Sequence, residues 1–146
     1  MINEIIEVYS KQLELYNTLK ETLERVENSD FDLITYNLEF ENADYLMDKI
    51  QRTNEKAEQL KVIYVSKNKL SDFIGGEIQR IEKEEDYLKL KEIIQSITAM
   101  IQKVKFIQDR AINRIRAEEN INKKVQSDMY KKNALNVYEN NREKKK

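Results

Sequence analysis

Three carboxylates, Glu41, Asp44 and Asp48, come closest in this sequence to a spacing that could do chemistry. On a helix they would share one face, because residues three, four and seven positions apart lie above one another. Carboxylates on facing helices bind metals in di-iron bundle proteins, but those sites also need Glu-x-x-His motifs, and this chain has no histidine. We interpret the three side chains as a solvated acidic face and expect no metal site.

The other candidate sites are two acidic clusters, residues 82–86 and 118–119, and the glycine pair Gly75 and Gly76. General acid–base catalysis needs a shaped and partly dry pocket, which the surface of a helix does not supply. No lysine and hydroxyl follow the glycines at P-loop spacing, so they do not form a phosphate site. Because histidine and cysteine are absent as well, we expect a protein without enzymatic activity and without a cofactor.

The composition indicates that any site must be positioned by helices. The chain has 146 residues, of which 40% are hydrophobic, enough for one domain with a modest core. It has no proline and only two glycines, which favours long helices over strands joined by tight turns. Its 26 basic and 27 acidic residues nearly cancel, so no overall field attracts nucleic acid or anionic lipid. With no signal-peptide pattern and no apolar run of about 18 residues, we expect a cytoplasmic protein without membrane insertion.

Apolar residues at intervals of three and four predict a first helix over residues 2–26 and a second helix over residues 30–69. Ser29, three residues before Asp32, has the spacing of a helix cap and indicates the turn between the two helices. The main stripe of the second helix is interrupted by Asn54 and consists of Leu33, Tyr36, Phe40, Ala43, Met47, Ile50, Ala57, Leu60 and Tyr64.

The second helix also carries a second apolar set, formed by Phe31, Ile34, Leu38 and Tyr45. At 100° per residue this set lies roughly opposite the main stripe, so a single buried face does not explain both. A helix that is apolar on both sides is either buried all round, which a bundle of this size hardly permits, or leaves one side for a partner. The sequence leaves both interpretations open.

Gly75 and Gly76 predict the second turn, because glycine reaches the left-handed conformation that ends a helix without steric cost. The acidic residues 82–86 then suit the positive end of a third helix, whose apolar stripe extends from Tyr87 to Ile115. Three helices with short connections fold most economically as an antiparallel bundle. The predicted fold is therefore all-α, an antiparallel three-helix bundle with long second and third helices and a C-terminal helical extension.

Beyond residue 120 the apolar residues become sparse, so we predict a helical bundle domain at residues 1–122 and a basic C-terminal segment at residues 123–146. That segment holds eight basic and three acidic residues, a net charge of +5, which leaves −6 for residues 1–122. It is either a flexible, solubilising tail or a docking segment with an apolar face ringed by lysines. This face would consist of Met129, Tyr130, Leu135, Val137 and Tyr138.

Four features of the layout occur together. The chain has an N-terminal amphipathic helix, a break at residues 28–30 and a long helix rich in Glu, Asn and Lys; its third apolar stripe, at residues 90–115, continues into residues 131–138. In these features nearly the whole chain resembles the FlgN and FliT class of flagellar secretion chaperones. The resemblance implies binding of a late axial export substrate, a hook-filament junction or filament cap protein, and its delivery to the cytoplasmic export gate. It also implies a docking role for a C-terminal tyrosine, Tyr138 or Tyr130.

We predict partner contacts on the second apolar set of the second helix and on the C-terminal segment, at Phe31, Ile34, Leu38, Tyr45, Met129, Tyr130, Leu135 and Tyr138. A second hypothesis is a structural coiled-coil or helical adaptor protein that self-associates, with the second apolar set as a homodimer interface. Nucleic-acid binding is disfavoured, because a basic patch of this kind normally belongs to a basic domain.

Overall fold

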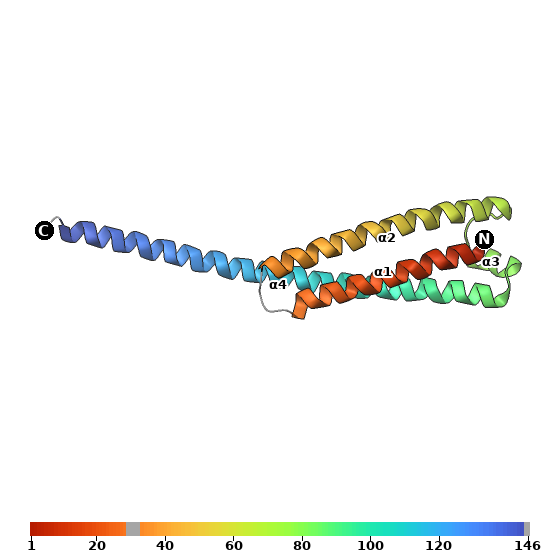
Figure 1. The fold of residues 1–146 in the computed structure, drawn as a ribbon, viewed down its shortest axis with the longest axis horizontal. Helices are drawn as coiled ribbons and strands as arrows, with labels where there is room; N and C mark the ends of the chain where they lie inside the picture. Colours follow the sequence, from red (N-terminus) through yellow and green to blue (C-terminus); the bar gives the residue numbers. More distant parts are fainter. Residues whose placement is uncertain (29–32, 145–146) are drawn as a thin grey trace.

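Helices account for the regular secondary structure in the part of the chain that this computed structural model describes, residues 1–28 and 33–144, with side chains at 1–28 and 34–135 (Figure 1). The four helices are α1 (Ile2–Asn28), α2 (Leu33–Lys67), α3 (Gly75–Ile81) and α4 (Glu84–Lys144). The predicted all-helical class is confirmed. The short helix α3 was not predicted, and Ser29 and Asp32, the expected cap, lie outside the described residues.

Helix α1 lies at the centre of the arrangement. It packs along its length against both α2 and α4, whereas no described Cα atom of α2 lies within 8 Å of one in α4. Figure 1 shows α1 and α4 running in the same direction and α2 running in the opposite direction. The three long helices therefore form an assembly that is open between α2 and α4.

Because α1 packs against both α2 and α4, it buries a broad arc of its surface. Val8, Gln12 and Thr22 are buried on α1 beside the apolar residues of the predicted stripe, such as Ile5 and Leu19. Two of these three additional residues are polar, so a search for apolar periodicity alone does not find them. The helix that needs two buried sides is thus α1, whereas the sequence assigned two apolar sides to α2.

Helices α2 and α4 each contribute narrow rows to the core. On both α2 and α4 the fully buried residues of the main row recur every seven residues. This spacing keeps each row on the side of its helix that faces the same neighbouring helix. These rows are Tyr36, Ala43, Ile50, Ala57 and Tyr64 on α2 and Leu90, Ile97, Val104 and Ala111 on α4.

The end of α2 corrects the predicted role of Gly75 and Gly76. Neither glycine has a positive φ, and Gly75 is the first residue of α3. The left-handed residue is Lys69, with φ of 55°. Its amide N–H donates to the Ser66 carbonyl, and the Leu70 N–H donates to the Val65 carbonyl, the bond pattern of a Schellman cap. Lysine takes this place at a cost, because a side chain crowds the left-handed conformation.

The connection from α2 through α3 closes one end of the molecule. The Tyr64 hydroxyl of α2 donates a hydrogen bond of 2.7 Å to the Glu82 carboxylate, just before α4. The ring of Phe73 meets the ring of Tyr64 edge-on, with centroids 5.6 Å apart. Burial and this carboxylate raise the pKa of the Tyr64 hydroxyl above its ordinary value.

At the other end of the molecule, α4 continues beyond the last residue of α1 and the first residue of α2. Arg110 forms an ion pair of 3.0 Å with the Glu27 carboxylate, and Arg114 donates to the Glu27 carbonyl, so α4 holds the last turn of α1. Among the side chains that the structure describes, Ala111 is the last that is fully buried, and each of those from residue 119 to residue 135 is exposed. We call residues 119–144 of α4 the extension; it projects alone from the bundle for roughly 40 Å (Figure 1).

Replacing Ile97 by alanine should lower the free energy of unfolding by about 2 to 5 kcal/mol, because its side chain is only 7% exposed in the core. The matched control is Ile101→Ala on the next turn of α4, where the side chain is 39% exposed and the loss should stay below about 1.5 kcal/mol. Urea unfolding followed by circular dichroism measures both. Equal losses would show that the core row of α4 is misplaced.

Replacing Lys69 by glycine should raise the free energy of unfolding by about 0.5 to 1 kcal/mol, because glycine adopts a positive φ without strain. Lys67→Gly, two residues earlier and still inside α2, is the control and should lower it by a similar amount. Thermal unfolding of both variants tests the cap. A destabilised Lys69→Gly variant would contradict the left-handed assignment.

Candidate functional site

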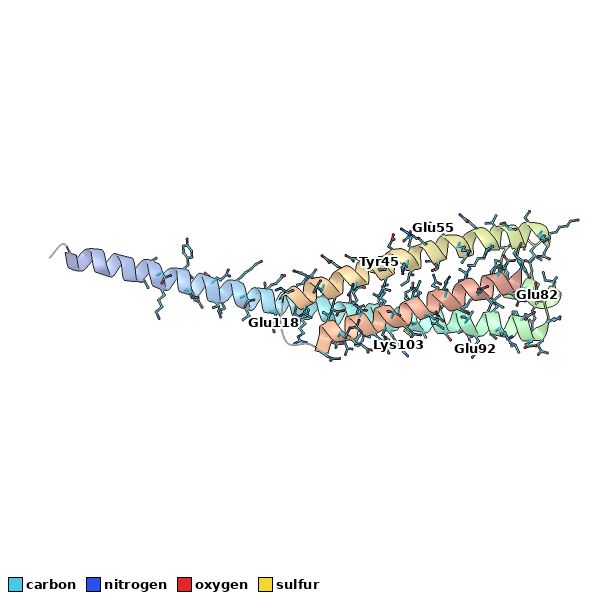
Figure 2. All side chains as sticks on the ribbon, in the orientation of Figure 1. Tyr45, Glu55, Glu82, Glu92, Lys103 and Glu118 are labelled. Carbon is cyan, nitrogen blue, oxygen red and sulfur yellow. The ribbon has the colours of Figure 1, made fainter. Side chains whose placement is uncertain are left out.

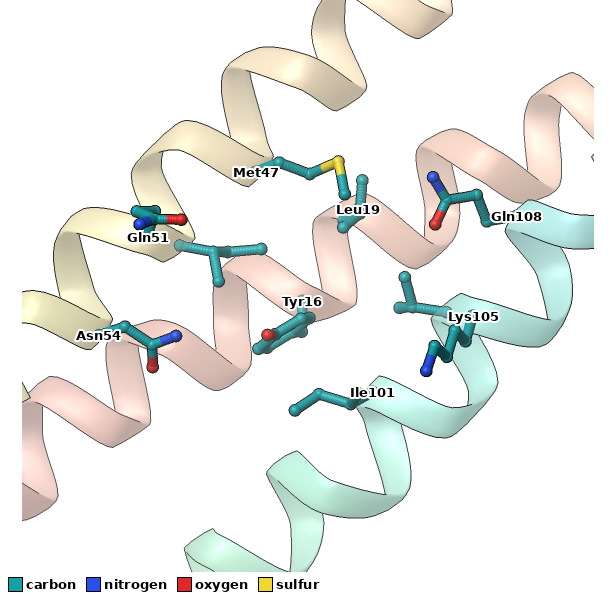
Figure 3. A pocket seen from close by; sticks show the side chains of 10 residues that line it. Tyr16, Leu19, Met47, Gln51, Asn54, Ile101, Lys105 and Gln108 are labelled. Atoms are coloured by element: carbon teal, nitrogen blue, oxygen red, sulfur yellow. The ribbon is translucent and has the colours of Figure 1, made fainter. Parts of the chain in front are cut away.

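The open side between α2 and α4 forms a trough with α1 as its floor (Figure 3). It has a volume of about 320 Å³, and residues of all three long helices line it. It is lined by Tyr16, Leu19, Met47, Ile50, Gln51, Asn54, Ile101, Val104, Lys105 and Gln108.

The floor and the lower walls of the trough are apolar. Leu19 of α1 is buried at the floor, and Ile50 and Val104 are buried where α2 and α4 meet it. Higher on the two walls Met47 and Ile101 remain 42% and 39% exposed, although both line the hollow. Apolar side chains in a concave site that the chain itself leaves uncovered are typical of a binding surface.

The two rims of the trough differ in charge. On α2 the rim residue Gln51 shares its side of the helix with Asp44, Glu55 and Glu58, which are seven before, four after and seven after it. On α4 the rim residue is Lys105, and the helical repeat places Lys91 and Arg116 on the same side. All five flanking residues are exposed, and Figure 2 shows Glu55 pointing outward from α2. The trough is therefore acidic along α2 and mainly basic along α4, where Lys91, Lys105 and Arg116 outnumber Asp109, which follows Lys105 by four residues.

A polar contact explains why Asn54 interrupts the main stripe of α2. The side-chain amide of Gln12 on α1, only 2% exposed, donates a hydrogen bond to the Asn54 carbonyl oxygen. A buried amide is costly without a partner, so Asn54 stabilises the packing of α1 against α2. The polar residue within an apolar stripe was the sequence signal for this contact, although its partner on α1 could not be identified.

The second apolar set of α2 does not line the trough. Ile34, Leu38 and Tyr45 are 72%, 56% and 60% exposed, and none of them belongs to its walls. The Tyr45 ring is partly covered by Lys49, whose Nζ lies 4.5 Å from the ring centroid. Phe31 lies outside the described residues. The sequence therefore identified a surface that the structure leaves open to solvent, but the hollow lies on a different side of α2.

The C-terminal residues of the predicted site lie on the extension, away from the trough. Met129, Tyr130 and Leu135 are 60%, 82% and 61% exposed. Tyr138 belongs to the helical part of α4 whose side chains are not described. The structure thus brings the predicted residues together in two separate places, the outer side of α2 and the extension. Their role in partner binding stays a prediction.

The groups that line the trough suit binding better than catalysis. They are aliphatic side chains, a methionine, three amides, the Tyr16 phenol and one lysine. Among the described residues no group of three or more histidine, cysteine, aspartate or glutamate side chains is placed to hold a metal ion. The described helices also include none that is long and apolar enough to cross a membrane.

Comparison with known proteins adds no further assignment: no protein-family model, curated protein or solved structure matches the chain. The geometry of the trough, together with the resemblance in layout, is therefore the basis for a functional proposal.

Proposed function

We propose that the protein binds an amphipathic α-helix of another protein in the trough, as a flagellar export chaperone of the FlgN and FliT class. The bound helix would belong to a late axial subunit, a hook-filament junction or filament cap protein, which the chaperone delivers to the cytoplasmic export gate. The observation that carries the proposal is the trough itself, an apolar floor on α1 between two helices whose described Cα atoms are nowhere within 8 Å of each other.

The packing of the three long helices supports the proposal that the protein binds a helix. An assembly of three helices that is open on one side can accept a fourth, and the result is a four-helix bundle with a common core. The apolar stripe of the incoming helix would cover Met47, Ile101 and Tyr16, in the helix-in-groove mode by which many proteins bind amphipathic segments. A helix with basic residues on the flank facing α2 and acidic residues on the flank facing α4 would match both rims.

The flagellar part of the proposal has different support from the helix-binding part. It rests on the layout of the sequence, an N-terminal amphipathic helix, a break at residues 28–30, a long helix rich in Glu, Asn and Lys, and a third apolar stripe that continues into residues 131–138. Physically, an export chaperone must cover an apolar terminal helix of its substrate so that the substrate does not polymerise early. A trough that binds one helix reversibly meets that requirement.

Self-association through the outer side of α2 is the second candidate function. The observation that favours it is the exposure of Leu38 and Tyr45, which together with Ile34 form a separate apolar surface. In that case the protein would be a structural coiled-coil or helical adaptor protein. Sedimentation equilibrium of the Leu38→Glu variant distinguishes the two functions, because only the structural protein would lose its association.

Replacing Ile101 by glutamate should weaken binding of a partner helix at least tenfold, because it places a carboxylate in the apolar wall of the trough. C-terminal fragments of hook-filament junction and filament cap proteins, mixed with the purified protein, provide the ligands. Size-exclusion chromatography and isothermal titration calorimetry measure the complex. The fold should be retained, because the Ile101 side chain is already partly exposed.

Leu38→Glu is the matched control, since it places the same charge on an exposed apolar residue of α2 outside the trough. It should bind the fragments as the unmodified protein does. Failure of every fragment to co-elute would count against the flagellar assignment. Loss of binding in Leu38→Glu with retention in Ile101→Glu would transfer the site to the outer side of α2.

A further inference from the structure

The extension carries an apolar row whose partner within the chain has ended. Ile121, Val125 and Met129 are 56%, 52% and 60% exposed. Val125 follows Ala111 by two heptads, so it lies on the face of α4 that is buried in the bundle. There this face packs against α1, which ends at Asn28 beside Arg114. The row thus continues an established helix–helix interface into solvent.

We propose that the stretch from Glu118 to Lys132 pairs with the same stretch of a second copy of the chain, antiparallel and with Val125 at the two-fold axis. Beyond Lys132 each helix diverges from the other copy, because α1 occupies this face of α4 up to Arg114. The proposal is independent of helix binding in the trough, because it uses a different part of α4. It also differs from self-association through α2, which would use the surface of Leu38 and Tyr45.

The spacing of the residues around Val125 supports this register. Ile121 precedes Val125 by four residues and Met129 follows it by four, so Ile121 of one copy lies opposite Met129 of the other. Glu118 lies seven residues before Val125, and Lys132 lies seven residues after it. The antiparallel register therefore sets a glutamate opposite a lysine at each end of the apolar contact. Figure 2 shows Glu118 where α4 leaves the bundle.

Charge favours the antiparallel direction over the parallel one. In a parallel pair Glu118 would face Glu118 and Lys132 would face Lys132, and like charges in such positions oppose pairing. On a larger scale, residues 123–146 carry a net charge of +5 and residues 1–122 carry −6. The parallel direction would place the two basic segments side by side, whereas the antiparallel direction runs them apart from the shared axis.

The size of the contact sets its expected strength. The row from Glu118 to Lys132 covers two heptads, roughly 21 Å of helix, with three apolar residues from each copy. This is less than most permanent dimers bury, so the pair should form and dissociate with concentration. We expect a dissociation constant on the order of micromolar at low salt, rising with ionic strength as the ion pairs are screened.

A single cysteine tests the register, because the chain contains none of its own. The Val125→Cys variant should form a disulfide-linked dimer under mild oxidation, since the two-fold axis brings the two Cα atoms close enough for the bond. The control is Ser127→Cys, two residues further and on the opposite side of the helix, which is also exposed. It should cross-link at least fivefold more slowly. Equal rates for the two variants would overturn the proposal.

Charge reversal tests the direction of pairing by sedimentation velocity. Glu118→Lys and Lys132→Glu should each weaken the dimer about tenfold, and the double variant should restore it, because the opposite charges face each other again. The proposal would be overturned if the double variant stayed weak or if the single variants associated like the unmodified protein. It would also be overturned if the unmodified protein stayed monomeric at all concentrations up to about ten times the expected dissociation constant.

Two further measurements separate this proposal from the others. Circular dichroism should show unchanged helix content and unfolding temperature in the charge variants, because both side chains lie beyond the last fully buried residue. The same variants should bind helical fragments in the trough like the unmodified protein, so loss of the dimer and failure of the chaperone proposal are distinguishable. A dimer that is lost in Leu38→Glu and retained in the charge variants would assign the interface to α2 and overturn the antiparallel pairing.

Discussion

The structure depends on one constraint: among the described residues, α1 is the one long helix whose Cα atoms lie within 8 Å of both other long helices. It contacts them through a broad buried arc that includes Gln12 and Thr22, two polar residues amid the aliphatic core. The hydrogen bond from Gln12 to Asn54 satisfies one of these polar groups across the α1–α2 contact. Because α2 and α4 each pack mainly against α1, those two helices bury only narrow rows of residues, and the bundle stays open on one side.

The trough and the extension are two consequences of this constraint. Where α1 is present, its exposed upper surface becomes the floor between Met47 on α2 and Ile101 on α4. Where α1 ends, the face of α4 that it covered continues without it, as the row around Val125. Both surfaces are apolar for the same physical reason: each belongs to a helix–helix contact that the chain supplies on one side only.

Apolar and charged side chains would have different roles in the two proposed contacts. Apolar side chains would supply most of the binding free energy in either contact, since exposed ion pairs are individually weak. The acidic rim on α2 and the mainly basic rim on α4 would instead select the orientation of a bound helix, and Glu118 and Lys132 would select the direction of a second copy. A chain with almost no net charge can therefore still select the orientation of a partner, because its acidic and basic side chains lie on different parts of the surface.

The sequence by itself determined the helical class, the three long amphipathic segments and the continuation of the last one, because these follow from local periodicity and from the absence of proline. It also identified Leu38 and Tyr45 as apolar residues outside the main stripe of α2. Only the tertiary structure decided that α1 is central, that Lys69 and not Gly75 adopts the left-handed conformation, and that the hollow lies beside Met47 and Ile101. The physical reason is that a helical pattern fixes which side of a helix is apolar, whereas the neighbour that covers that side depends on how all the helices pack together.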